Sequence, residues 1–259
     1  MNIYMKPSFA ILYKTFHYTI KISGDRTGMI SKKTTFTLAV QFLILVLFTG
    51  QAYAWFGRTH LAIAKAAGYR YWYNAAAADI AKLKAGDIER FNHYVDNPKG
   101  TVITPGMVLR QAERYNDPHD KSGHLYGAIL ASVRQYIKDK NEGRNPEDVM
   151  AYCVHYVGDL SMPLHNTPFD EFNKKYHMQL DGIIDDEILD NVSKIKINHI
   201  SIKSENDLIR EIVRIANISM KLGFRLEAEN RLMTKDEAYR QVSLSASLLK
   251  AILVYVDSK

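Results

Sequence analysis

Apolar residues recur every three or four positions along most of the chain after residue 57, and strict alternation is rare. Side chains at this spacing share one face of a helix, so the pattern predicts helices rather than strands. The predicted helices cover 58–73, 75–94, 105–116, 124–140 and 174–189, and further helices begin at Asn145, Ser204 and Thr234.

Three of these helices carry capping signals at their starts. Asn145 precedes Pro146 and two acidic residues. An Asn side chain can accept a hydrogen bond from a free N–H at a helix N-terminus, Pro is favoured at the first helical position, and acidic side chains complement the partial positive charge there. Ser204 is also followed by acids, and Thr234 with Glu237 resembles a capping box. Local chemistry therefore sets where these helices begin.

The segment 194–202, with the sequence KIKINHISI, is the one strand-like piece, and we expect an extended connector or a short hairpin arm there. Residues 55–259 contain no internal repeat, no low-complexity segment and no Pro/Gly-rich linker. The length suits one domain with a sizeable core. The predicted fold class is all-α, a single multi-helix domain over 55–259.

Residues 1–54 have the organisation of an N-terminal extension with a secretory signal peptide. Two lysines precede an apolar run, and Ala52-Tyr53-Ala54 forms a small-residue cleavage site. A membrane anchor is the alternative, but the run is short for the ~20 residues that a span needs and Gln41 interrupts it. We therefore predict cleavage before Trp55, a periplasmic or secreted mature protein, and no integral span in the mature form.

The net charge changes with that cleavage, whereas the cysteine content does not. Six of the 34 Lys and Arg and one of the 28 Asp and Glu lie in 1–54, so the mature chain has a net charge of about +1. The basic pI gives no support for a stable nucleic-acid partner. Cys153 is the only cysteine, so no intrachain disulfide forms. It lies in the apolar stripe of the helix that begins at Asn145, and we expect it to be a buried packing residue.

The stretch YCVHYVGDLSMPLH, residues 152–165, carries the first candidate chemistry. His155 and Asp159 are four apart and share a helix face, and Pro163 ends that helix so that His165 lies on the following turn. Imidazole nitrogens and a carboxylate that can bridge two ions are typical ligands of first-row metals. A buried helix with satisfied histidines is the alternative interpretation.

Further candidate ligands occur at useful spacings on both sides of this stretch. His177 and Asp181 are again four apart on a predicted helix, and Asp117 and His124 flank a Pro-containing turn. Asp120 is an alternative to Asp117, and His119 an alternative to His124. Other histidines and aromatic residues are expected to be ordinary core, rim or surface residues: His93, His119, His199 and the cluster Tyr69-Tyr71-Trp72-Tyr73. The acids Asp185, Asp186 and Glu187 are expected to lie on a solvated face.

WFGRTH after a signal peptide, then HYVGDLSMPLH and HMQLD, resembles the zinc-dependent phospholipase C and single-strand-specific nuclease superfamily. In that family the mature chain begins with a Trp whose α-amine and carbonyl chelate zinc, and Trp55 follows the predicted cleavage point. An α-amine has a pKa of about 8, low enough for zinc to displace its proton. The resemblance implies three zinc ions, held by Trp55, His60 and Asp159; by Asp117, His124, His155 and Asp159; and by His165, His177 and Asp181.

The resemblance further implies phosphodiester hydrolysis, with Asp117 as a candidate catalytic base that orients the attacking water. The short spacer between His165 and His177 favours a phospholipase C that acts on phospholipids, with transient contact to a membrane surface. The Trp55–His60 spacing and Asp181 favour the alternative, a single-strand nuclease or 3′-nucleotidase. A non-catalytic zinc-binding protein is the third hypothesis.

Overall fold

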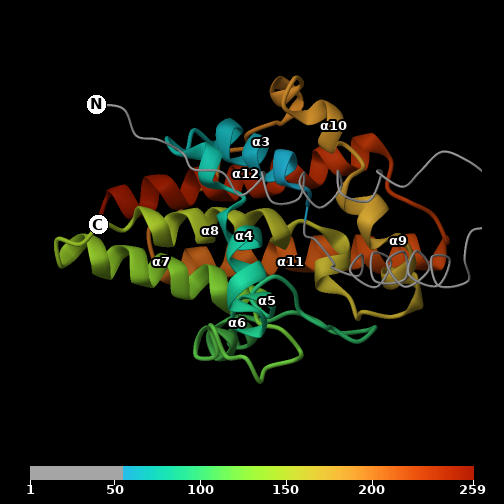
Figure 1. Ribbon diagram of the computed structural model, residues 1–259, viewed down its shortest axis with the longest axis horizontal. Helices are drawn as coiled ribbons and strands as arrows, with labels where there is room; N and C mark the ends of the chain where they lie inside the picture. The colour runs from blue at the N-terminus through green and yellow to red at the C-terminus, as the bar shows by residue number, and fades with distance from the viewer. Residues whose placement is uncertain (1–54) are drawn as a thin grey trace, which may run out of the picture. The chain divides into compact units, whose positions relative to one another are not determined.

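The computed structural model describes residues 55–259, so the predicted signal peptide and its cleavage site lie outside the described residues. Four long helices, α7, α8, α11 and α12, lie side by side, with α3 packed on α8 and α12 and α6 packed on α7 (Figure 1). No strand is assigned between residues 55 and 259, which confirms the all-α prediction. The helices are α3 Gly57–Ala67, α4 Ala77–Ala85, α5 Asp87–Arg90, α6 Pro105–Ala112, α7 Leu125–Asn141, α8 Glu147–Leu160, α9 Glu171–Asp181, α10 Asp185–Ile188, α11 Glu205–Ala228 and α12 Lys235–Asp257, with the 3-10 turns η1 Trp72–Asn74, η2 Pro163–Asn166 and η3 Val192–Lys194.

Helix α8 is the central element of the core. It packs against α7, α3, α4, α11 and α12, and nearly all of its residues from Met150 onward are buried. Cys153 is fully buried there, as expected, and burial raises the pKa of its thiol to about 12. Polar side chains on this helix are therefore held away from water and must find partners inside the protein.

The predicted caps at Ser204 and Thr234 are confirmed, whereas α8 begins one residue later than expected, with Pro146 at its cap position. Ser204 and Asp207 form a reciprocal capping box at α11, and Thr234 and Glu237 form another at α12. At α8 the Asn145 side chain accepts a hydrogen bond from the Glu147 backbone N–H, at 3.2 Å. These contacts satisfy orphan N–H groups of the first turns.

Helix ends and breaks were predicted less well, because glycine conformation interrupts two expected helices. Gly68, with φ 84°, ends α3 well before residue 73. Gly86, with φ 57°, divides the expected helix over 75–94 into the short helices α4 and α5. Both conformations are open to glycine at little steric cost. The expected helix over 174–189 is likewise two helices, α9 and α10.

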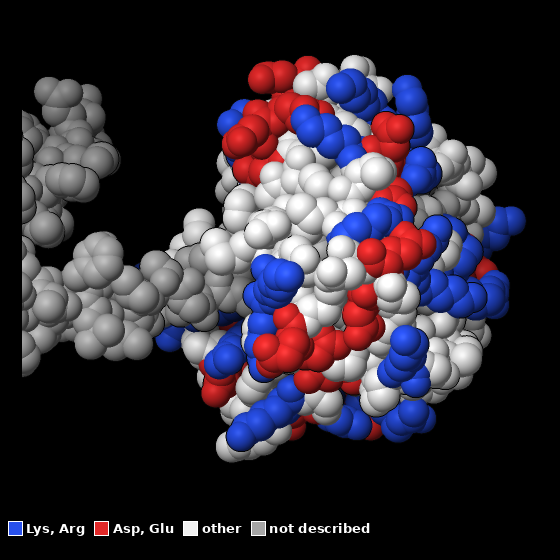
Figure 2. Space-filling model, turned by 90° about the vertical axis from the view of Figure 1, so that its right-hand side faces the viewer, with Lys and Arg blue, Asp and Glu red and all other residues white. Residues whose placement is uncertain are grey.

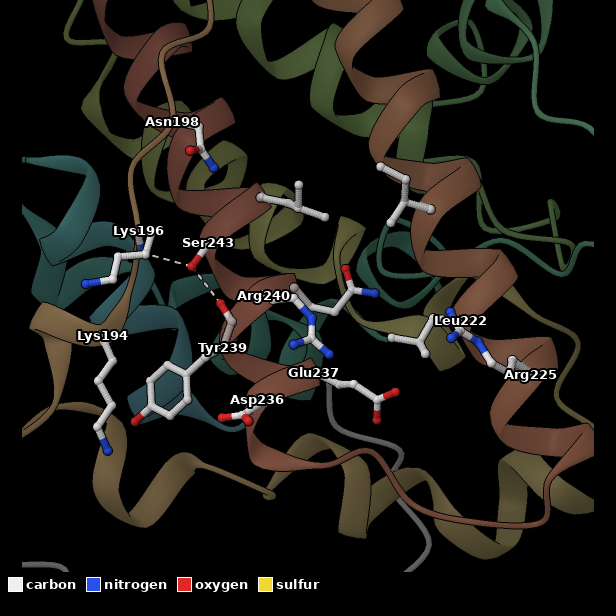
Figure 3. Close-up of a pocket in the computed structure, with 13 residues that line it drawn as sticks. Lys194, Lys196, Asn198, Leu222, Arg225, Asp236, Glu237, Tyr239, Arg240 and Ser243 are labelled. Carbon is white, nitrogen blue, oxygen red and sulfur yellow. Dashed lines mark hydrogen bonds between the residues drawn. The ribbon is translucent and has the colours of Figure 1, made fainter.

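The strand-like segment is an extended connector that lies along α12. The Lys196 N–H donates to Ser243 Oγ at 2.9 Å (Figure 3), and the Asn198 N–H donates to Ser247 Oγ, also at 2.9 Å. Two serine hydroxyls four residues apart on α12 thus accept hydrogen bonds from alternate N–H groups of the segment. They take the place that a neighbouring strand would have in a sheet.

Two expectations about surface residues have different outcomes. The face drawn in Figure 2 shows Lys and Arg side chains interleaved with Asp and Glu, in line with a net charge of about +1 for residues 55–259. Asp185, however, is buried, which corrects its assignment to a solvated face. Its Oδ1 accepts hydrogen bonds from the Thr59 N–H at 2.9 Å and from the Thr59 hydroxyl at 3.1 Å, which ties α10 to α3.

Gly127 allows the backbones of α6 and α7 to touch. A Cβ at this position would lie 2.0 Å from the Gln111 carbonyl carbon, and the Gln111 Oε1 already accepts the Tyr126 and Gly127 N–H groups. We expect Gly127→Ala to lower the free energy of unfolding by about 3 kcal/mol, because the backbone cannot yield as a side chain can. Urea denaturation measures the change. Gly106→Ala, which meets only the flexible end of Arg110, is the control and should alter stability by less than about 0.5 kcal/mol.

Candidate metal centre

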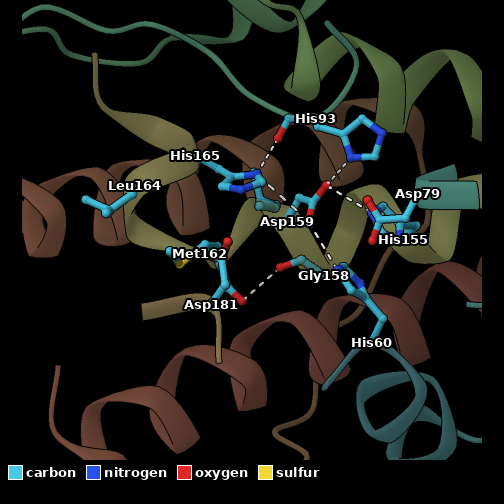
Figure 4. A network of polar contacts seen from close by, with 12 residues as sticks. His60, Asp79, His93, His155, Gly158, Asp159, Met162, Leu164, His165 and Asp181 are labelled. Atoms are coloured by element: carbon cyan, nitrogen blue, oxygen red, sulfur yellow. Dashed lines mark hydrogen bonds and ion pairs between the residues drawn. The ribbon is translucent and has the colours of Figure 1, made fainter. Parts of the chain in front are cut away.

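The Asp159 carboxylate is fully buried and lies at the centre of a ring of imidazoles (Figure 4). Its Oδ1 is 3.3 Å from His60 Nε2 and 3.9 Å from His165 Nδ1. Its Oδ2 is 2.9 Å from His93 Nδ1 and 3.4 Å from His155 Nε2. Burial by itself would raise the pKa of Asp159, but His155 and His165 hold it well below the usual range. The group is therefore an anion inside the core.

Outer contacts orient several of these rings. His155 Nδ1 is 2.9 Å from the Ala75 carbonyl oxygen, and His165 Nδ1 is 2.5 Å from the His93 carbonyl oxygen. A carbonyl can only accept, so each Nδ1 carries a proton and Nε2 is the ring nitrogen that is left to bind a metal ion. This arrangement, in which a second contact fixes the tautomer, is typical of metal-binding histidines.

The donors fall into three groups whose ligand atoms lie within 4.8 Å of one another. Asp79, on α4, belongs to one of them, with its Oδ1 3.7 Å from His155 Nε2. Burial would lower the pKa of His155, but Asp159 and Asp79 raise it to about 9. A divalent ion binding here would displace that proton. The groups are His60, Asp79 and His155; His93, His155 and Asp159; and His165, His177 and Asp181.

The third group joins η2 to the C-terminal end of α9. His177 Nε2 is 3.2 Å from Asp181 Oδ2 and 3.2 Å from His165 Nε2. Burial raises the pKa of Asp181 well above the usual range, and the negative charges of Asp159 and Asp79 add to the effect. A cation at this position would relieve that unfavourable burial.

The buried polar atoms fit bound metal ions. Most of the buried side-chain nitrogens and oxygens without a hydrogen-bond partner in the described part of the chain belong to these groups. A buried polar atom that lacks a partner is costly, and coordination would satisfy it. The atoms concerned are both ring nitrogens of His60, Nε2 of His93 and of His155, Oδ1 of Asp159 and both carboxylate oxygens of Asp181.

A glycine on α8 makes room for one of the rings. A Cβ on Gly158 would lie 2.4 Å from His60 Nδ1 and 2.6 Å from its Cε1. Gly158 immediately precedes Asp159, so the absence of a side chain lets the His60 ring approach the carboxylate from α3. The same ring stacks on His155 with centroids 3.8 Å apart.

Asp117 and His124, expected to hold the second ion, lie outside these three groups. His124 Nε2 is 2.7 Å from Asn92 Oδ1, and its Nδ1 is 3.2 Å from Asp120 Oδ2. Asp117 instead accepts the N–H of His119, within its own turn. The alternative ligands Asp120 and His119 also lie outside the groups. Asp120 accepts a hydrogen bond from Arg114, and His119 is exposed.

The structure places Asp79 and His93 in the groups, whereas the sequence spacing offers no matching partner for His93. The two lie fourteen apart in the sequence, on either side of the break at Gly86, so no helical spacing connects them. The available signal was Gly86 itself, because a glycine within a helix-length pattern marks a possible bend. A bend there is what allows α4 and the loop after α5 both to face α8.

The start of the described chain lies beside the third group. The Phe56 N–H donates to the backbone carbonyl of Asp181 at 3.4 Å, and the Trp55 side chain is fully buried. Trp55 therefore directly precedes Phe56, whose backbone N–H is bonded to the candidate ligand Asp181. His60, one helical turn further on, belongs to the first group.

No family model, curated protein or solved structure matches this chain. The resemblance to the phospholipase C and nuclease superfamily consequently rests on the sequence motifs. Within residues 55–259, no helix is both long enough and apolar enough to cross a bilayer.

The revised ligand set can be separated from the original one by metal analysis. We expect Asp79→Asn and His93→Gln each to lose about one equivalent of bound zinc, because each removes a donor from a buried group. Asp117→Asn and His124→Gln should keep the wild-type content, as should the exposed-site control His199→Gln. Loss of metal only in the Asp117 and His124 variants would restore the original assignment.

Gly158→Ala tests the approach of His60 to Asp159. The added methyl group forces the His60 ring away, so we expect weaker binding of one zinc, by about ten-fold or more. Competition against a chromophoric chelator measures this affinity. Gly106→Ala is again the matched control, and equal zinc affinity in both variants would show that the close contact has no role in metal binding.

Proposed function

We propose that this protein is a zinc-dependent phosphodiester hydrolase that acts on phospholipids in the manner of a phospholipase C. The observation that carries the proposal is the buried Asp159 carboxylate within reach of four imidazoles, three of which have ring nitrogens without a hydrogen-bond partner. A core with a purely structural role rarely contains so many buried nitrogen and oxygen atoms without hydrogen-bond partners.

Three ions can be assigned to the donors of the chain. Asp79, His93, His155 and Asp159 would hold the first, and Trp55 with His60 and Asp159 the second. His165, His177 and Asp181 would hold the third. When bound, zinc supplies Lewis acidity that activates water and polarises phosphoryl oxygens.

The role that the sequence assigned to Asp117, orienting the attacking water, belongs in this proposal to Asp79. Asp79 is partly exposed at the edge of the cluster, whereas Asp117 lies in a separate turn. Burial would raise the pKa of Asp79, but His155 and Lys82 lower it to about 2. The carboxylate is therefore ionised at neutral pH and can accept a hydrogen bond from water.

A lipid substrate is supported by apolar side chains near the candidate ligands. Ile80 and Leu83 share α4 with Asp79 and are each 63% exposed, and Phe169 is 50% exposed with its ring 6.3 Å from that of His177. Exposed apolar side chains beside a cleavage site suit contact with acyl chains. On the face drawn in Figure 2, basic and acidic side chains are interleaved and do not form the continuous basic surface that a polynucleotide requires.

Single-strand nuclease activity is the alternative, and the same Phe169 supports it, because an exposed aromatic ring next to the site can stack on a base. A zinc-binding protein without catalytic activity is the third possibility. The three hypotheses predict different products from the same purified protein.

The N-terminal ligand and the reaction can be tested together. A chain that begins at Trp55 should bind about three zinc ions, whereas a chain with one alanine ahead of Trp55 should bind at least one fewer, because the α-amine becomes an amide. The first chain should release diglyceride from phosphatidylcholine, and chelation should abolish the activity until zinc is returned.

Two results would contradict the proposal. Equal zinc content in the two chains would remove Trp55 from the ligand set. Release of mononucleotides from single-stranded DNA without diglyceride would identify a nuclease, and zinc binding without either product would identify a non-catalytic protein.

A further inference from the structure

A groove on α11 and α12 shares no residue with the metal centre. It lies between these helices and the extended segment that Ser243 and Ser247 hold along α12, and its volume is about 680 Å³ (Figure 3). A second hollow of about 420 Å³ shares Asn198 and Leu244 with it, so the two continue into one another. This volume is in the range of sites for small organic molecules, roughly 300–1,000 Å³.

One wall of the groove is apolar. Ile218 and Leu222 on α11 face it together with Leu244 on α12, and Ile218 is 39% exposed although it is a large aliphatic side chain. An aliphatic strip between two helices suits a hydrocarbon chain, because burial of its methylenes removes apolar surface from water.

The rim is basic and has few acidic partners. Lys196, Arg225 and Arg240 line the groove, and none of the three forms an ion pair within residues 55–259. Of the two acids at the rim, Glu237 is bound by Arg231 through both oxygens. Asp236 alone opposes the three cations, so the groove favours an anion.

A buried polar group provides an independent indication of a ligand. Gln241 lines the same groove, is only 2% exposed, and its Oε1 has no hydrogen-bond partner. A buried acceptor in this state is satisfied by a donor that enters the groove, such as a hydroxyl.

We propose that this groove binds a single-chain amphiphile with an acidic head group. The chain would lie on Ile218, Leu222 and Leu244, and the phosphate or carboxylate would face Arg225 and Arg240. A hydroxyl next to the head group would donate to Gln241. Lysophosphatidic acid offers all three features, and a fatty acid offers the chain and the anion only. The site is independent of the metal centre and does not rest on the proposed hydrolase activity.

Calorimetric titration of the protein with lauroyl lysophosphatidic acid and with laurate, below their micellar concentrations, tests the proposal. We expect both to bind, and neither glycerol phosphate nor dodecanol to bind measurably, because each lacks one half of the recognised chemistry. Stronger binding of the lysophospholipid would identify a phosphorylated lipid as the preferred source, and equal binding would identify a fatty acid.

Variants separate this groove from other sites. Arg225→Gln combined with Arg240→Gln should weaken binding of both ligands by about ten-fold or more, whereas Arg110→Gln, an exposed arginine on α6, should not. Gln241→Leu should weaken only the lysophospholipid, and its melting temperature should be no lower than that of the wild type, because an unsatisfied buried amide has been removed. Absence of binding would overturn the proposal. Binding that is unchanged in the double arginine variant would also overturn it, because the anion would then bind elsewhere, for example at the candidate metal centre.

Discussion

A carboxylate buried at the middle of the core helix is the constraint on which the rest of this structure depends. Asp159 has no access to water, and an isolated anion in that position would be strongly unfavourable. The protein compensates by directing imidazoles toward it from α3, from the loop after α5, from η2 and from α8 itself. The positions of these elements around α8 are thus coupled to one charge.

The compensation is incomplete in the protein alone, which is why metal binding is an integral part of the proposal. Ring nitrogens of His60, His93 and His155 lack hydrogen-bond partners, and burial raises the pKa of Asp181 well above the usual range. Proton binding at His155, whose pKa is about 9, offsets part of the negative charge. Divalent ions would offset more of it, so stability and activity would depend on the same ligands.

The helices that close the core contribute a different kind of chemistry. α11 and α12 have capped starts, long apolar faces and serines that bind an extended segment, and together they leave a groove with a basic rim. This groove and the metal centre lie on different sets of residues. A soluble or membrane-derived amphiphile could therefore bind without displacing any candidate metal ligand, and regulation or delivery of lipid would be compatible with hydrolysis elsewhere on the molecule.

Features that depend on neighbours within one or two helical turns could be predicted from the amino-acid sequence. Capping residues at Asn145, Ser204 and Thr234 set helix starts, and the four-residue spacings of His155 with Asp159 and of His177 with Asp181 placed each pair on one face. Both results follow from local hydrogen bonding and the period of the helix.

The distant residues that complete the groups could not be predicted in this way, because they are brought together by the packing of the folded chain. Asp79 and His93 reach α8 because the chain bends at Gly86, whereas Asp117 and His124 are engaged within and beside their own turn. Any imidazole that packs close to Asp159 can interact with its charge. The spacing of residues in the sequence does not show which loop will pack against α8. Long-range packing therefore determines which of several chemically equivalent residues lie in the candidate groups.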